Sequence, residues 1–164
     1  APTRGLMGYT SRFLTLTKGT GVINRIFHGY GKFEGEMDGR KNGALISMST
    51  GKAVAFAIFN LQARGEMFVT HNDPVYEGMI VGLTPKPGDM IINVMKGKQL
   101  TNMRTQGTDE NVVLTPVRQM SIAEQLSMLN TDEALEITPK SLRLRKAILN
   151  PHDRKKSEKS GAAA

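Results

Sequence analysis

The side chains with the clearest chemical potential lie in one polar stretch, from Lys96 to Arg104. It combines three cations, two amides and a threonine hydroxyl, and no acidic residue follows before Asp109. Long cationic side chains bind phosphates, and amides bind base edges or sugar hydroxyls. The stretch therefore predicts an RNA-contacting loop, although an ordinary solvated hairpin loop is the alternative. Its candidate RNA-binding residues are Lys96, Lys98, Gln99, Asn102 and Arg104.

A second basic region lies near the end of the chain. The net charge of the 164 residues is +7, and residues 140–159 alone contain eight basic and two acidic side chains. Arg143 and Arg145 alternate with leucines, so on a strand they share one face, from which two guanidinium groups can bind phosphates bidentately. Lys146 adjoins them, and all three are candidate RNA-binding residues. We expect a polyanionic partner here, and a solubilising tail is the alternative.

Catalytic chemistry is poorly supported by the remaining residues. Cysteine is absent, which excludes disulfides, thiolate catalysis and cysteine-based metal sites. The sequence at 49–52 resembles the end of a phosphate-binding P-loop, but Ile46 replaces the required glycine and Ala53 replaces the magnesium-binding hydroxyl. The three histidines lie far apart in sequence, without zinc-ligand spacing. We therefore expect no enzyme activity, no cofactor and no metal in these residues.

The elements that must position these side chains follow from periodicity and turn signals. A helix is expected over 3–17, weakened by Gly5 and Gly8, and then a strand over 21–30 that lacks a partner in its own segment. The polar segment 34–43 predicts a boundary. After it we expect strands at 44–48, 66–69, 79–83, 90–95, 111–117, 134–138 and 141–144, and helices at 52–64, 121–129 and from 150.

These elements predict an α+β fold with a mainly antiparallel, barrel-like sheet across 43–148, a few short helices and a deeply buried helix at 53–64. Ser121 and Glu124 have the spacing of a capping box, and Asn150-Pro151 is a typical helix start. We expect three parts, at 1–33, 34–150 and 151–164, the last being a basic, flexible tail. No window approaches the roughly 20 apolar residues of a membrane span.

Several blocks of the sequence resemble a known family. Residues 4–9, 13–17 and 19–21 look like the closing helix and strand of the fifth domain of translational GTPases such as elongation factor G. The blocks at 42–47, 50–53, 76–80 and 96–104 resemble the C-terminal region of the BipA/TypA GTPases, and the likeness runs from about residue 1 to 156. Residues 1–33 would then be the second half of the elongation-factor-like domain, and 34–150 the family-specific domain.

The resemblance implies a function that composition alone does not show. Full-length members bind the ribosome at the elongation factor G site, hydrolyse GTP, and are linked to stress adaptation and large-subunit assembly. Their C-terminal domain reaches the large subunit and the acceptor arm of A-site tRNA through a loop that matches 96–104 here. The family's GTP-binding domain precedes the matched region, so we expect no GTPase activity in these residues, with GTP and Mg bound elsewhere in the parent.

The expected partners are large-subunit rRNA, A-site tRNA and the other domains of a parent chain in the cytoplasm. The alternative is a protein-interaction module that docks those other domains. Because the opening helix and strand leave apolar faces without partners, self-association of the chain is a further expectation.

Overall fold

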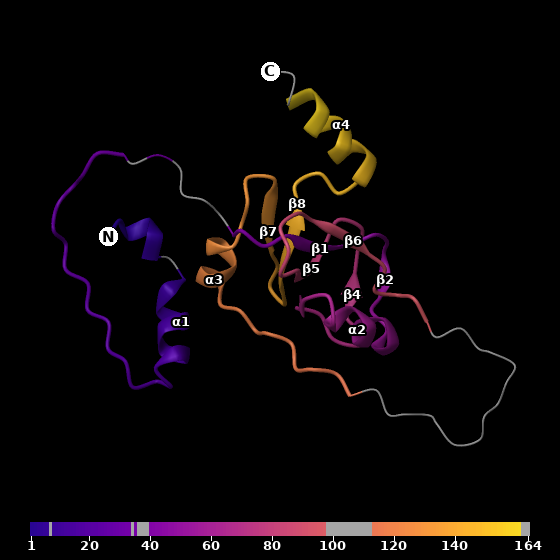
Figure 1. Ribbon diagram of the computed structural model, residues 1–164, viewed down its shortest axis with the longest axis horizontal. Helices are drawn as coiled ribbons and strands as arrows, with labels where there is room; N and C mark the ends of the chain where they lie inside the picture. Colours follow the sequence, from indigo (N-terminus) through magenta and orange to yellow (C-terminus); the bar gives the residue numbers. More distant parts are fainter. Residues whose placement is uncertain (7, 34, 36–39, 98–112, 162–164) are drawn as a thin grey trace, which may run out of the picture. The chain divides into compact units, whose positions relative to one another are not determined.

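A computed structural model of the chain describes all residues except 7, 34, 36–39, 98–112 and 162–164. The described residues form two compact units (Figure 1). The first comprises residues 1–41 and 120–131, and the second comprises residues 42–119 and 132–164. None of the helices in this described part is long and apolar enough to cross a membrane.

The first unit is helical. It contains a 3-10 helix, η1 (Thr3–Leu6), and two α-helices, α1 (Tyr9–Leu16) and α3 (Ile122–Ser127). The single helix expected over 3–17 is interrupted at Gly8, whose φ of 72° is left-handed and favours glycine. A Cβ atom at Gly8 would lie 2.7 Å from Oγ of Ser127, so the glycine also permits α3 to approach closely.

The Ser121 cap predicted at the start of α3 is confirmed. The Ser121 hydroxyl accepts a hydrogen bond from the Glu124 amide at 3.3 Å, which satisfies one of the free N–H groups of the first turn. The strand predicted over 21–30 is not formed. Its residues are extended without a neighbouring strand, and Tyr30 is fully exposed. A strand needs a partner for its backbone hydrogen bonds, and the described part of this unit offers none.

The second unit is built on a four-stranded sheet in the order β3-β5-β1-β6. Its strands are β1 (Ala44–Ser47), β3 (Glu66–Met67), β5 (Ile80–Leu83) and β6 (Met90–Ile92). The β1–β5 and β3–β5 pairs are antiparallel, and β1–β6 is parallel. Central strands β1 and β5 are buried at all four positions, which fits their continuous apolar sequences.

Two short antiparallel pairs complete the strands that the structure describes. They are β2 (Gly51–Lys52) with β4 (Pro74–Val75), and β7 (Glu133–Ile137) with β8 (Leu142–Lys146). The mixed α+β fold with mainly antiparallel sheets is thus confirmed, but these separate sheets do not close into a barrel. The strand expected over 111–117 is absent from residues 113–117, and residues 111 and 112 lie outside the described part.

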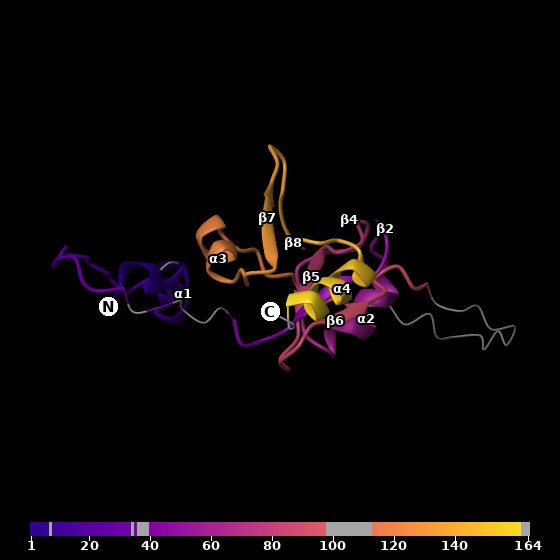
Figure 2. The same ribbon diagram turned by 90° about the horizontal axis from the view of Figure 1, so that it is seen from above.

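The β7–β8 hairpin extends away from the four-stranded sheet (Figure 2) and is attached to it at one end. Arg145 forms an antiparallel bridge with Met79, and the Lys146 amide donates to the Gly78 carbonyl at 2.9 Å. A Cβ atom at Gly78, where φ is 82°, would lie 2.7 Å from Cα of Leu149. Glycine is therefore needed at this junction for both its φ and its small size.

Helix α2 (Ala55–Gln62) covers part of the sheet, but it is less buried than the sequence predicts. Of its eight residues, Ala57 and Ile58 are buried, whereas Phe59 is 49% exposed. The helix begins later than expected, because residues 51 and 52 form β2 and the Ala55 amide donates to Nδ1 of His71 at 3.2 Å. The apolar core includes Ile58 of the helix together with Leu45, Val81 and Val94.

Contacts divide the described residues at other positions than the parts expected at 1–33, 34–150 and 151–164, which stay a prediction. The first unit extends to residue 41 and takes in residues 120–131, partly because Arg40 donates to the Met128 carbonyl at 2.9 Å. Residues 151–161 form helix α4 (Pro151–Gly161). Its predicted start is confirmed, since Oδ1 of Asn150 accepts from the His152 amide at 2.8 Å.

Candidate nucleic-acid interface

The predicted RNA-binding loop begins where the second unit's sheet ends. Strand β6 is followed by a turn in which Oδ1 of Asn93 accepts from the Met95 amide at 2.9 Å. Lys96 comes next and is exposed. Four of the five predicted loop residues lie outside the described part of the chain: Lys98, Gln99, Asn102 and Arg104. The structure therefore places the base of this loop and leaves the predicted contacts of those four residues as predictions.

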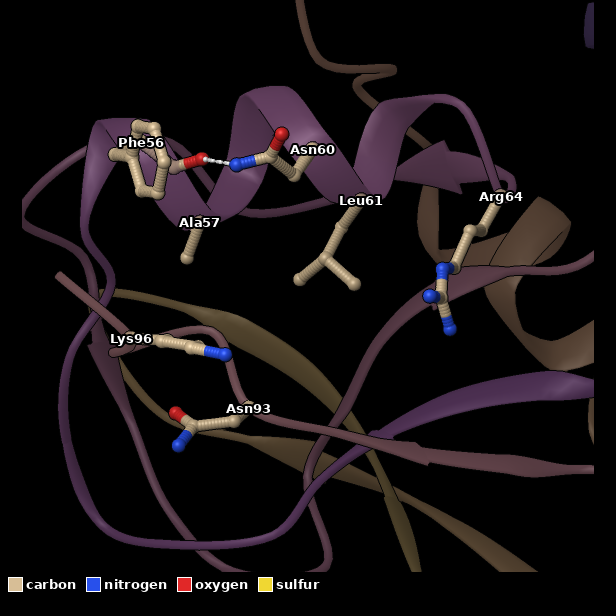
Figure 3. A pocket seen from close by; sticks show the side chains of 7 residues that line it. All are labelled: Phe56, Ala57, Asn60, Leu61, Arg64, Asn93 and Lys96. Carbon is tan, nitrogen blue, oxygen red and sulfur yellow. Dashed lines mark hydrogen bonds between the residues drawn. The ribbon is translucent and has the colours of Figure 1, made fainter. Parts of the chain in front are cut away.

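Lys96 lines a groove beside α2 (Figure 3). We call this cavity, of about 270 Å³, the α2 groove. Asn93 and Lys96 lie on one side of it, and Ala57 and Leu61 of α2 lie on the other, followed by Arg64 in the turn after the helix. Ala57, Leu61 and Arg64 were not among the predicted site residues, because their order in the sequence forms no recognisable motif. Only the fold brings Arg64 opposite the start of the basic loop.

The arginines of β8 lie on one strand face, as the alternation predicts. In the β7–β8 register, Arg143 is opposite Glu136 and Arg145 is opposite Ala134. Arg143 forms an ion pair with Glu136 at 3.3 Å, and its side chain is 28% exposed. Arg145 donates to the backbone carbonyl of Lys146 at 3.1 Å. Both arginine side chains thus contact other parts of the protein and stay partly exposed. Each guanidinium group can therefore also contact a phosphate.

Tyr76, which directly follows β4, contacts the partner of one of these arginines. Its hydroxyl donates to Oε2 of Glu136 at 2.6 Å. Burial of the phenol raises the pKa of Tyr76 to about 12, and the hydrogen bond and negative charge of Glu136 act in the same direction, against the opposing charges of Arg145 and Arg143. The phenol therefore stays protonated and holds Glu136 between itself and Arg143.

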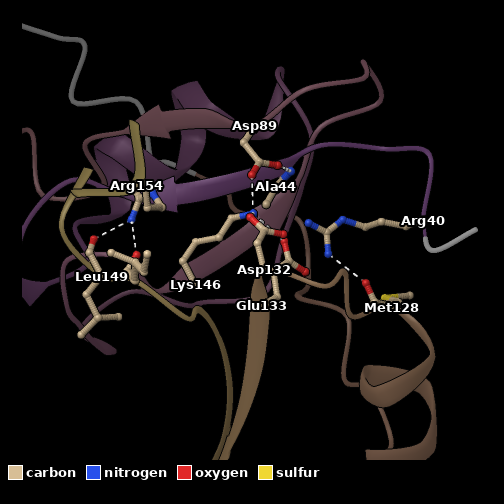
Figure 4. Close-up of polar contacts among 10 residues, drawn as sticks. Arg40, Ala44, Asp89, Met128, Asp132, Glu133, Lys146, Leu149 and Arg154 are labelled. Carbon is tan, nitrogen blue, oxygen red and sulfur yellow. Dashed lines mark hydrogen bonds and ion pairs between the residues drawn. The ribbon is translucent and has the colours of Figure 1, made fainter. Parts of the chain in front are cut away.

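Lys146 has a different environment from the exposed phosphate-binding side chain that the sequence predicts (Figure 4). Its side chain is 2% exposed, and Nζ lies 2.5 Å from Asp89, 2.6 Å from Asp132 and 2.9 Å from Glu133. Asp89 also accepts from the Ala44 amide at 2.7 Å. We name Lys146 and these three carboxylates the Lys146 cluster. Its ammonium is not exposed to a phosphate, so in this structure Lys146 has a structural role.

Electrostatics agree with that structural role. Burial lowers the pKa of Lys146, but hydrogen bonds from its ammonium to Asp132, Asp89 and Glu133 outweigh burial, and the net pKa is raised above its ordinary value. The charged form is therefore the stable one. Lys146 at the end of β8 thus contacts Glu133 of β7 and Asp89, which directly precedes β6. Asp89 in turn connects the cluster to β1 by accepting from the Ala44 amide.

Further exposed cations lie on α4. Lys155, Lys156 and Lys159 are exposed, whereas Arg154 donates to the carbonyl oxygens of Ile148 and Leu149 at 3.0 and 2.5 Å and so anchors the start of the helix. The helix is polar around its circumference, which is typical of a solvated or polyanion-binding helix. Among the described residues, no group of three His, Asp or Glu side chains is placed to hold a metal ion.

Comparison with known proteins identifies the family. A sequence model of the TypA/BipA C-terminal domain matches residues 42–151, which is more than half of the chain. The chain belongs to the TypA/BipA family. The matched range begins where the second compact unit begins and ends at the start of α4, so the sheet, the α2 groove and the Lys146 cluster all lie within the family domain.

Curated relatives extend the match to nearly the whole chain. "Large ribosomal subunit assembly factor BipA" of Buchnera aphidicola is 48% identical over 157 residues, which are 95% of this chain. The proteins of the same name from Salmonella typhimurium and Haemophilus influenzae are 46% and 42% identical over 96% and 97% of the chain. The chain spans about a quarter of the length of these relatives, since the matches cover 26% of each.

Proposed function

We propose that the chain is the ribosome-contacting C-terminal region of a TypA/BipA-like translational GTPase and acts in large-subunit assembly. The observation that carries the proposal is the 46% identity, over nearly all of the chain, to a factor whose name states that activity. The proposed partners are large-subunit rRNA and A-site tRNA. A ribosomal partner would place the chain in the cytoplasm, and the stress role of the family would come with the parent protein.

The charges of the second unit support RNA as the partner. Lys96 is exposed at the base of the predicted loop, and α4 adds further exposed lysines. Arg143 and Arg145 are partly exposed on one strand face. Such cations bind phosphates with a strong dependence on salt, because binding releases condensed counterions. Lys146 is not part of this proposed contact, since its ammonium is held by three carboxylates.

The direct test is binding of the chain to purified large subunits across a salt series. Lys98→Ala/Arg104→Ala should weaken binding and flatten the log–log salt slope by about 2, because each lost phosphate contact removes about one unit of slope. Lys52→Ala/Lys86→Ala is the matched control, since it removes the same charge from two exposed positions of the second unit. Equal affinities and slopes for the two double variants would refute loop contact with RNA.

We further propose that these residues catalyse no reaction and bind no cofactor, with GTP and Mg bound by the nucleotide domain of longer family members. The incomplete P-loop at residues 49–52 supports this, because Gly51 and Lys52 form strand β2 and do not lead directly into a helix N-terminus. GTP hydrolysis by the purified chain, above the rate of a heat-treated sample, would overturn the proposal.

A second candidate function is a docking module for other domains of the parent, or for another copy of the chain. Residues 22–33 favour it, since several large apolar side chains there are largely exposed: Val22, Ile26, Phe27, Tyr30 and Phe33 at 74–100%. Such a stretch is typical of an interaction site. Ribosome binding through this surface would change little with salt, whereas RNA contact weakens steeply. Sedimentation of the chain alone would detect self-association.

A further inference from the structure

The α2 groove has a chemical pattern that goes beyond a general attraction for phosphates. It lies between one face of α2 and the turn that follows β6 (Figure 3), entirely within the second unit. The residues that line it combine an apolar wall with amides and cations, and none of them is acidic. A cavity of about 270 Å³ is slightly smaller than the roughly 300 Å³ at which pockets for drug-sized ligands begin. It therefore suits one small ring system with its substituents.

The apolar wall comes from α2. Leu61, which is half-buried, and Ala57, which is only 4% exposed, are one helical turn apart and both point toward Asn93 and Lys96 in Figure 3. Phe56 lies beside them at the start of the helix and is half-buried. Flat rings stack on such aliphatic and aromatic surfaces, and base stacking tolerates different sequences because every nucleobase has a π-face.

The polar groups surround this wall. Oδ1 of Asn93 is occupied by the Met95 amide at 2.9 Å, so the NH2 group of the same side chain is the part that can donate to a ligand. Asn60 lies on the helix side of the groove, where its amide nitrogen donates to the Phe56 carbonyl at 2.8 Å. In Figure 3 the Asn60 oxygen points away from Asn93 and Lys96, so the Asn93 NH2 group is the polar group best placed for a ligand. A donor beside an apolar surface matches the acceptor atoms on the edge of a nucleobase.

Cations lie at two places along the groove. In Figure 3 the Arg64 side chain extends from the turn after α2. Lys96 extends into the groove from the segment that follows β6. Arg64 contacts Sδ of Met90 at 3.8 Å, which is a weak acceptor. Among the residues that the structure describes, neither cation is paired with a carboxylate. Both can therefore bind a phosphate without first breaking an ion pair.

We propose that the α2 groove holds a single unpaired nucleotide of RNA, with its base against Leu61, next to Ala57, and its flanking phosphates at Arg64 and Lys96. This inference rests on the proposed RNA-binding function, and it names the chemical class that this part of the interface recognises. An isolated phosphate would leave the apolar wall uncovered. An acidic peptide would pair with the cations but offers no flat ring to cover the apolar wall. A nucleotide offers both a ring for the wall and phosphates for the cations.

The test is methyl NMR of the 164-residue chain, titrated with a single-stranded ribonucleotide trimer. The methyl resonances of Ala57 and Leu61 should move upfield as a base ring covers them. Inorganic phosphate and an acidic tripeptide, added at the same ionic strength, should leave these methyl resonances in place. Equal methyl shifts with the acidic tripeptide would overturn the assignment to RNA.

Two variants sharpen the test. Asn93→Asp keeps the acceptor for the Met95 amide but replaces the free donor with a negative charge. It should weaken trimer binding about tenfold, which lies within the range for losing one base contact. Arg64→Ala/Lys96→Ala should also weaken binding, whereas the control Lys52→Ala/Lys86→Ala should change it less than about twofold.

The outcomes separate the groove from the proposed function. If the chain binds large subunits with a steep salt dependence but the trimer leaves Ala57 and Leu61 unmoved, the groove assignment is wrong and RNA contact elsewhere stands. If neither large subunits nor the trimer bind, both proposals fail. Trimer-specific methyl shifts that Asn93→Asp weakens would establish the groove, whatever the affinity for large subunits.

Discussion

Lys146→Met tests the structural role of the Lys146 cluster. The substitution keeps a side chain of similar length but removes the ammonium that three carboxylates share. Breaking a buried ion pair from one side typically costs about 3–5 kcal/mol, because it leaves an uncompensated buried charge. Asp132 and Asp89 are 58% and 33% exposed and can turn to water, whereas Glu133 is fully buried. We therefore expect a loss near the lower end, about 3 kcal/mol of unfolding free energy.

Urea unfolding followed by circular dichroism measures that loss, and amide hydrogen exchange of β1 and β5 reports on the second unit alone. A companion variant, Lys146→Met/Glu133→Gln, removes the stranded charge as well and should regain about half of the lost stability. If Lys146→Met costs less than about 1 kcal/mol, which is typical of a surface pair, the cluster does not hold the hairpin as the structure indicates.

The same cluster predicts the alkaline behaviour of the fold. Folding raises the pKa of Lys146, so its stabilising contribution is complete below its ordinary value of 10.5 and is lost as pH rises through the higher folded pKa. Unfolding free energies of the native chain should therefore fall at high pH. Lys146→Met should remove the part of this fall that arises from the ammonium. An identical pH dependence in the two proteins would contradict the assignment.

Three further predictions concern single positions. Tyr76→Phe should reduce the loss of stability between about pH 10 and 12, because the folded phenol titrates near 12 and the unfolded one near 10; an unchanged alkaline profile would argue against its hydrogen bond to Glu136. Gly65→Ala should cost more than about 3 kcal/mol by urea unfolding, since its Cβ would lie 1.9 Å from the Leu83 carbonyl oxygen, and a near-neutral effect would show that the backbone there can move. Gly8→Ala should lower the stability of the helical segment by about 1 kcal/mol or more, because the position has a left-handed φ. The loss should appear as reduced helicity in circular dichroism at 222 nm, and undiminished helicity would contradict it.

Sequence patterns predicted the second unit's elements well where local rules decide them. The strands β1, β5 and β6 and the hairpin β7–β8 lie within a residue or a few of their predicted ranges, because apolar runs bounded by turn residues specify strands. The helix caps at Ser121 and Asn150 were likewise predictable, since a capping side chain and its amide are near neighbours in the chain.

Features that depend on distant residues were not predictable in the same way. Lys146 follows two arginines in a basic run, and nothing local distinguishes it from an exposed cation. Its burial depends on Asp89, which is 57 positions earlier in the chain, and on the pairing of β7 with β8. The α2 groove likewise depends on residues that are distant in the sequence. Arg64 and Lys96 line the same groove only when β6 is paired with β1.

The predicted strand at 21–30 failed for a complementary reason. Its alternating apolar residues favour a strand, but a strand forms only when a neighbour satisfies its backbone groups. The described residues of the first unit provide no such neighbour, and side chains such as Ile26 and Tyr30 stay exposed. Local pattern therefore identified the propensity correctly while the missing pairing partner determined the conformation.

Site-directed cross-linking from the base of the loop tests the central claim of RNA contact most directly. The chain contains no cysteine, so Gly97→Cys provides a unique attachment point for a photoreactive probe, and a Cβ at Gly97 meets no atom within 4 Å among the described residues. Lys86→Cys, in an exposed turn of the same unit, is the control. With large subunits carrying A-site tRNA, we predict cross-links to RNA from position 97 and few from position 86. Equal yields from the two positions, or cross-links from position 97 to protein alone, would contradict the account.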